Sequence, residues 1–177
     1  MKIHKSTQIG LMDTTLPVAE DSRIKILEET LPLVATLADL ALKTKHAHWN
    51  LRGDDGYSAH KLLDELNDEL LELTDTLAER CGALGGYVPG VPSAILKGTR
   101  LSEFPQNGLL ISTAFDYLTA IQGQLTEASR AFRLADEIVG DKNNVFSDSV
   151  TSNILQEMIG RLERMSYLTG LNKKDVT

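Results

Sequence analysis

Two histidines and three carboxylic acids in the first half of the chain have the types and spacing of transition-metal ligands. They are His48, His60, Asp64, Asp75 and Glu79. On a helix with His60 taken as zero, the three acids lie about 40°, 60° and 100° around the axis, so these four share one face. Imidazole combined with carboxylates suits Fe(II), Mn(II) or Zn(II), whereas calcium and magnesium sites rarely recruit histidine. The five side chains predict a metal centre capable of redox chemistry.

This stripe of ligands is too long to close around one ion within one chain. From Asp64 to Asp75 a helix rises roughly 16 Å, whereas a transition metal bonds to nitrogen or oxygen at ~2 Å. An antiparallel copy related by a two-fold axis would set the His60 end of one chain against the Glu79 end of the other. No histidine follows a glutamate by three residues, which disfavours a di-iron site inside one chain. We therefore predict that metal binding and dimerisation are linked.

Apolar periodicity predicts the helices that must position these ligands. Long helices are expected over about 21–50, 55–84, 107–139 and 147–169, with a short one over 93–97. Pro32 either kinks the first helix or lies in its first turn after a cap at Thr30. Gly85-Gly86 ends the second helix, and a proline-rich crossover follows. The expected class is all-α, a ferritin-like four-helix bundle with a long crossover that contains a short helix between helices 2 and 3.

Length, charge and composition narrow the class of protein. The 177 residues, 42% of them hydrophobic, suit one domain over 21–170, with a flexible arm over 1–20 and a short tail over 171–177. A net charge of −7 argues against a dedicated nucleic-acid binder. The single cysteine, Cys81, cannot form an intrachain disulfide. With no signal peptide and no run of ~20 apolar residues, we expect a cytoplasmic protein without a membrane partner.

The ligand segments closely resemble the signature of the Dps family, the mini-ferritins. The similar segments are KHAHWNLRG at 45–53, His60 with Asp64, DTLAER at 75–80 and Leu-Gly-Gly at 84–86. The resemblance implies a hollow homododecamer of tetrahedral symmetry, built through two-fold and three-fold interfaces, with ferroxidase centres at the two-folds. It implies that each centre binds two iron ions, that hydrogen peroxide is the preferred oxidant, and that ferric mineral is stored in the cavity. Zinc and manganese would be competitors.

In such a centre the resemblance takes His48, His60 and Asp64 from one subunit and Asp75 and Glu79 from its partner. It also assigns roles to two neighbours of His48. Trp49 would quench stray radicals beside the centre or anchor the interface, and Lys45 would hydrogen-bond near the site or remain exposed.

The start of the fourth helix departs from the family pattern. Residues 151–153 read Thr-Ser-Asn, where relatives often carry Thr-x-Asp beside the pores through which iron enters. Asp141 and Asp148 are the nearest substitutes.

Two functions of different kinds remain open at this stage. The leading hypothesis is a ferroxidase and iron-storage cage that protects against oxidative stress. The alternative is a structural, nucleoid-associated protein that condenses DNA through basic ends and uses the metal site secondarily. Lys2, Lys5, Lys173 and Lys174 could contact DNA, whereas the negative charge of a whole cage would oppose it.

Overall fold

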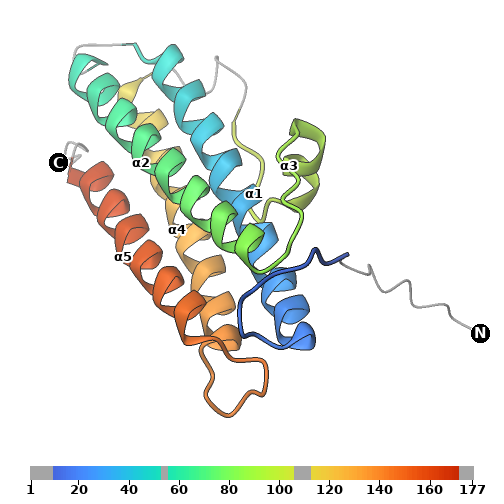
Figure 1. The fold of residues 1–177 in the computed structure, drawn as a ribbon. Coiled ribbons are helices and arrows are strands. Elements are labelled where there is room, and N and C mark those ends of the chain that lie inside the picture. The colour runs from blue at the N-terminus through green and yellow to red at the C-terminus, as the bar shows by residue number, and fades with distance from the viewer. Residues whose placement is uncertain (1–9, 53–55, 106–112, 172–177) are drawn as a thin grey trace, which may run out of the picture.

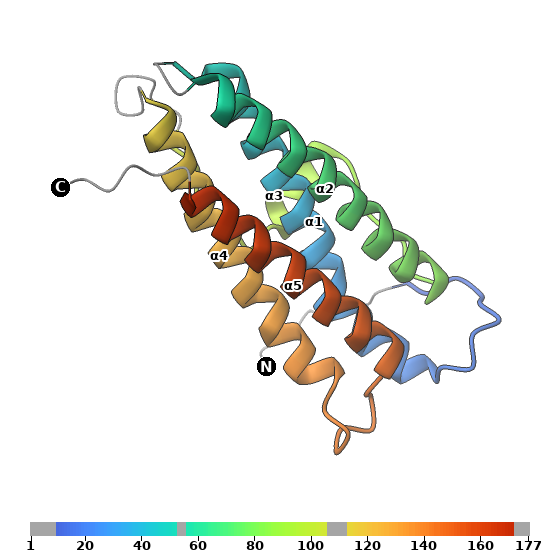
Figure 2. The ribbon, with the colours of Figure 1, turned by 90° about the vertical axis from the view of Figure 1, so that its left-hand side faces the viewer.

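Four long helices form a bundle in the computed structural model, which describes residues 10–52, 56–105 and 113–171. α1 packs mainly against α2, α4 packs mainly against α5, and the short α3 lies outside the bundle against α1 (Figures 1 and 2). The predicted all-α, ferritin-like bundle with a short helix in the crossover is confirmed. The helices are α1 (Glu20–Asn50), α2 (Gly56–Ala83), α3 (Pro92–Gly98), α4 (Ala114–Val139) and α5 (Ser149–Leu171).

The sequence of α2 shows why this helix exposes the ligand stripe. Leucines at alternating intervals of three and four residues form one apolar face that packs into the core. Charged and polar side chains occupy the opposite face, which leaves the acids accessible. The buried leucines are Leu63, Leu66, Leu70, Leu73 and Leu77, each at most 2% exposed.

The structure decides whether Pro32 lies inside the first helix or in its first turn. α1 begins at Glu20 and continues past Pro32, so the expected first turn after a cap at Thr30 is wrong. Thr30 instead lies in the helix interior and donates from Oγ1 to the carbonyl of Ile26 at 2.8 Å. Thr36 likewise donates to the carbonyl of Pro32 at 2.7 Å.

α4 begins later than the apolar pattern predicted. Thr113 and Asp116 form a capping box, in which each side chain accepts from the other's backbone N–H, and the helix starts at Ala114. Residues 107–112, which the pattern placed in this helix, lie outside the described residues.

The glycine pair after α2 also holds the N-terminal segment. Gly85 has φ +83°, a left-handed conformation that favours glycine, and its carbonyl accepts from the N–H of Met12 at 2.7 Å. A Cβ at Gly85 would collide with the Met12 carbonyl oxygen. Thr14 donates to the carbonyl of Ala83 at 2.7 Å. Residues 1–9 of the expected flexible arm lie outside the described residues, whereas residues 11–14 are attached to the end of α2.

None of the described helices is long and apolar enough to cross a membrane.

Candidate metal centre

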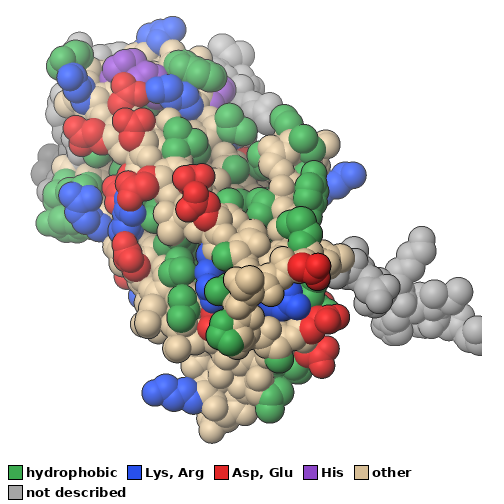
Figure 3. All heavy atoms as spheres, viewed as in Figure 1, with side chains coloured by type: hydrophobic (Ala, Val, Ile, Leu, Met, Phe, Trp, Pro, Cys, Tyr) green, Lys and Arg blue, Asp and Glu red, His purple; other side chains and the backbone are tan. Residues whose placement is uncertain are grey.

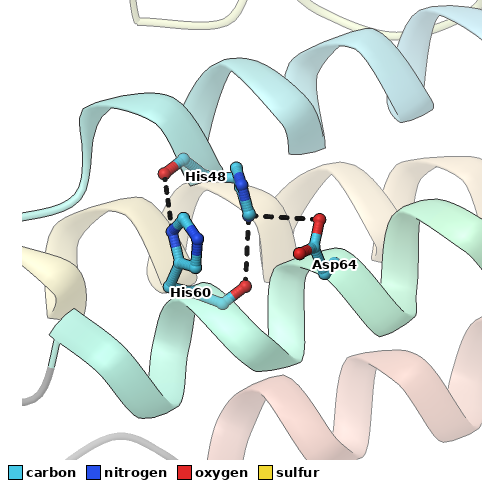
Figure 4. Close-up of side chains that lie close together, drawn as sticks. All are labelled: His48, His60 and Asp64. Atoms are coloured by element: carbon cyan, nitrogen blue, oxygen red, sulfur yellow. Dashed lines mark hydrogen bonds and ion pairs between the residues drawn. The ribbon is translucent and has the colours of Figure 1, made fainter.

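The end of α1 and the start of α2 bring three of the predicted ligands together. His48 lies in the last turn of α1, and His60 and Asp64 lie one turn apart near the start of α2 (Figure 4). One potential ligand atom from each side chain lies within 4.8 Å of the others. His48 is buried, Asp64 is half-buried and His60 is exposed, so the cluster opens onto the surface.

The two imidazoles orient each other through the backbone. Nδ1 of His48 lies 3.1 Å from the carbonyl oxygen of His60, and Nδ1 of His60 lies 3.3 Å from that of His48. The rings stack with their centroids 3.6 Å apart. Because a carbonyl oxygen only accepts, each Nδ1 carries a proton, and Nε2 is the ring atom left to bind a metal. Sequence reasoning missed this pairing of imidazole and carbonyl groups, and no pattern of residue types could have revealed it.

Lys45 contacts the third ligand. Its Nζ lies 2.5 Å from Oδ1 of Asp64, and the same oxygen lies 3.4 Å from Nδ1 of His48. The hydrogen bond from Lys45 lowers the pKa of Asp64 below its usual value, and the charges of the two histidines act in the same direction. Asp64 is therefore a carboxylate at neutral pH, available to a cation.

Asp75 and Glu79 do not join this cluster within the chain. Both are exposed on α2. Because α2 is continuous from Gly56 to Ala83, the axial distance from Asp64 to Asp75 is the roughly 16 Å expected from the helix rise. Among the described residues, no ion pair or hydrogen bond engages either carboxylate. One chain thus gathers three candidate ligands at one place and presents two more at another.

The neighbouring residues singled out in the sequence occupy different environments. Trp49 follows His48 and is 64% exposed. His46 points elsewhere, with its ring edge-on to Phe104 and Tyr117. Asp141 is an exposed loop acid whose carboxylate accepts from the N–H of Asn143 at 2.9 Å.

Asp148, the other acid considered for a pore, is held within its own chain. Its carboxylate accepts from the N–H of Thr151 at 2.9 Å, as an N-cap of α5, and pairs with Arg80 at 2.6 Å. Burial raises the pKa of Asp148, but the hydrogen bonds from Thr151 and Arg80 outweigh it, so the net pKa lies below its usual value. The acid is therefore charged and engaged at neutral pH.

Comparisons with known proteins agree with this architecture. The family model of the ferritin-like domain matches residues 28–170. The DNA protection during starvation protein of Agrobacterium fabrum is 35% identical over 155 residues, covering 87% of this chain and 86% of that one. Its counterpart in Mycolicibacterium smegmatis is 32% identical over 155 residues, covering 86% and 80%.

The structure of DpsA14 from Streptomyces coelicolor has the same fold, with a TM-score of 0.84, 23% identity and 95% of each chain covered. The fold and the family match define a ferritin-like protein. Within that superfamily, the chain belongs to the Dps family.

Proposed function

We propose that this protein is a ferroxidase that oxidises Fe(II), preferentially with hydrogen peroxide, and stores the ferric product inside a cage in the cytoplasm. Each centre would combine His48, His60 and Asp64 of one subunit with Asp75 and Glu79 of the partner subunit. The observation that carries the proposal is the division of ligands on α2: one end contributes to a three-residue cluster and the other presents two unengaged acids.

The spacing of the two pairs supports a shared centre. His60 and Asp64 are four positions apart, and so are Asp75 and Glu79. In an antiparallel alignment of two α2 helices, His60 therefore faces Glu79 when Asp64 faces Asp75. A two-fold axis produces this alignment twice, so each dimer would carry two equivalent centres.

The donor set matches the chemistry of iron oxidation. Two Fe(II) ions bring four positive charges, and the three carboxylates would neutralise three of them. Because oxidation adds one positive charge to each ion, the same carboxylates stabilise Fe(III) more than Fe(II). Each Fe(II) gives one electron, one peroxide accepts both as its O–O bond breaks, and hydrolysis to ferric oxyhydroxide releases protons. Zinc or manganese would compete for the same donors.

Exposed apolar side chains support assembly into a larger particle. Figure 3 shows them among acidic groups on the face that carries α2 and α3. A single chain with so many large apolar groups in solvent is expected to bury some of them against copies of itself. We propose the homododecamer typical of Dps proteins, with two-fold and three-fold interfaces. Exposed groups on α1, α2 and α3 include Leu42, Trp49, Tyr57, Leu71 and Leu96, each more than half exposed.

Complementation between two inactive variants tests whether the centre is shared. The first variant carries His60→Ala and Asp64→Ala, and the second carries Asp75→Ala and Glu79→Ala. Each alone should lack rapid peroxide-driven Fe(II) oxidation while keeping the wild-type mass. In cages co-expressed at equal levels, about one quarter of the centres would combine two unmutated halves. The initial rate should therefore recover to about a quarter of the wild-type rate.

Cages assembled separately and then mixed are the control, because no recovery is expected unless subunits exchange after assembly. A centre built within one chain would give no recovery in co-expressed cages either, since every chain is broken. That result would refute the shared centre. Wild-type rates in the first variant alone would refute the ligand assignment.

DNA binding is a second candidate function because the relatives are named for DNA protection during starvation. Lysines that could contact DNA lie in 1–9 and 172–177, outside the described residues. A gel-shift series across salt concentrations should compare the full chain with a deletion of residues 1–9, which spares the contact of Met12 with Gly85. A shift that the deletion abolishes would support DNA binding, and no shift at low salt would exclude it.

A further inference from the structure

Arg161 and Arg80 each link α2 to α5 through hydrogen-bonded ion pairs, which we call ties. One tie lies on each side of the segment that carries Asp75 and Glu79. The first comes from Arg161 on α5. Its Nε donates to Glu69 at 2.9 Å, and its two terminal nitrogens donate to the two oxygens of Glu72 at 3.0 and 3.1 Å. Such a forked pair constrains direction as well as distance.

The second tie comes from Arg80 on α2. Its Nη2 lies 2.6 Å from Oδ2 of Asp148, and its Nε donates to Oγ1 of Thr151 at 3.0 Å. The side chains of Arg80 and Asp148 are each only 12% exposed. Because Asp148 also caps α5, this tie fixes the last turn of α2 to the first turn of α5.

The Arg80 tie faces away from the metal ligands, whereas Glu72 of the Arg161 tie lies on their side of α2, about 20° around the axis from Glu79. Arg80 points about 100° around the helix from Glu79, toward its own bundle, so it does not touch an ion bound by that carboxylate. Apolar contacts of Leu73 and Leu77 hold α2 on the core but are not directional. The arginine hydrogen bonds are directional, so they limit the rotation of the segment between them.

Small rotations of α2 matter for a centre completed by another chain. A carboxylate about 6 Å from the helix axis moves about 1 Å when the helix turns by about 10°. Metal sites need their ligands held within about 0.5 Å. Within the described residues, the ties engage Glu69 and Glu72 and leave Asp75 and Glu79 without ion pairs, so the ligands of this segment remain free for a cation.

We propose that Arg80 and Arg161 are positioning residues for the ligands that each chain donates to its partner: by fixing the rotation of α2 against α5, they aim Asp75 and Glu79 across the interface. The inference rests on the proposed function, since it names residues that prepare one half of the shared centre.

Cobalt binding tests this role without turnover. Arg80→Gln and Arg161→Gln each break one tie, and Arg133→Gln is the matched control, because Arg133 pairs with Glu163 between α4 and α5. Anaerobic titration with Co(II) measures affinity, and the visible absorption of bound Co(II) reports its coordination. Changes in residues that orient metal ligands typically weaken binding about 10- to 100-fold. We expect losses of this size and altered absorption in both test variants, but wild-type behaviour in the control.

Assembly is measured first, by mass in solution. If Arg80→Gln does not assemble, the result for Arg161→Gln decides, because that guanidinium is less buried and its loss disturbs the core less. If the arginines have a merely structural role, their replacement would lower the melting temperature and leave Co(II) affinity and absorption unchanged. That result would overturn this inference but not the proposed function. If the wild-type cage binds no Co(II), or binds it unchanged after His60→Ala and Asp64→Ala, the proposed function fails as well.

Discussion

Replacing Lys45 with methionine should tighten metal binding at the centre. The ammonium group of Lys45 lies 2.5 Å from Oδ1 of Asp64, so it occupies a carboxylate oxygen that a metal ion would use. It also places a positive charge beside the incoming cation. Both effects oppose metal binding, and methionine removes both while keeping a long, unbranched side chain.

The structure bounds the size of this effect. The side chains of Lys45 and Asp64 are 32% and 49% exposed, so water screens their attraction strongly. Exposed ion pairs of this kind change an equilibrium by a factor of about five at most. We therefore expect Co(II) to bind Lys45→Met about two- to fivefold more tightly than wild-type near pH 7.

The pH dependence of Co(II) binding provides a second test, because at acidic pH the variant should lose the metal more readily than wild-type. Lys45 lowers the pKa of Asp64, so its removal lets that pKa rise toward the usual 3.8. A proton then competes with the metal at higher pH than in wild-type. The acidic limb of Co(II) binding should shift upward in the variant, although its affinity near neutrality is greater.

Anaerobic Co(II) titrations between pH 3.5 and 7.5, a range chosen to bracket that pKa, would measure both effects. Lys61→Met is the control, because it removes one positive charge from the residue that follows His60. The Nζ of Lys61 lies over the ring of Tyr57 and not on Asp64. Weaker binding by Lys45→Met would show that the lysine orients Asp64 for the metal, and the argument from competition would be refuted.

Three positions away from the centre give further tests of the fold. Thr44 is fully buried and its hydroxyl has no hydrogen-bond partner among the described residues, so Thr44→Val should stabilise the protein by up to about 1 kcal/mol in urea unfolding; a loss of stability would contradict this. Burial raises the pKa of Cys81 from 9.0 to about 11, so its thiolate at pH 8 is about 100-fold scarcer, and a thiol reagent should react only after denaturation; rapid labelling of the native protein would be the opposing result. Gly85→Ala should cost about 1–2 kcal/mol and speed proteolysis near Met12, whereas an unchanged urea midpoint would show that the turn adapts.

The arrangement of ligands along α2 could be predicted because it depends on helix geometry alone. Once residues 56–83 are helical, the angles between His60, Asp64 and Asp75 follow from the number of residues between them. The apolar spacing and the glycine pair were strong enough to establish that helix and its end.

Contacts between helices could not be predicted in the same way. Lys45 and Asp64 are 19 positions apart, and Arg80 and Asp148 are 68 apart. Whether two long polar side chains meet depends on the rotation and sliding of packed helices, which a periodic pattern in one helix does not contain.

One boundary was missed although its signal was present. Thr113 and Asp116 have the three-residue spacing of a capping box. The apolar residues 109–111 extended the helical pattern past that signal and drew the predicted start of α4 back to residue 107. A cap is a local hydrogen-bonding device, and here it was a better guide to the first turn than hydrophobicity.

The continuity of α2 between its two ligand pairs limits how this chain can change in length. Inserting one residue between 65 and 74 would turn Asp75 and Glu79 by about 100° relative to His60 and lengthen the helix by about 1.5 Å. The two ligand pairs would then no longer lie on the same face of α2, even if every ligand were retained. Apart from Glu69 and Glu72, which pair with Arg161, this stretch should accept many replacements of side chains on its solvent face, whereas a single codon added or removed there should disable the centre.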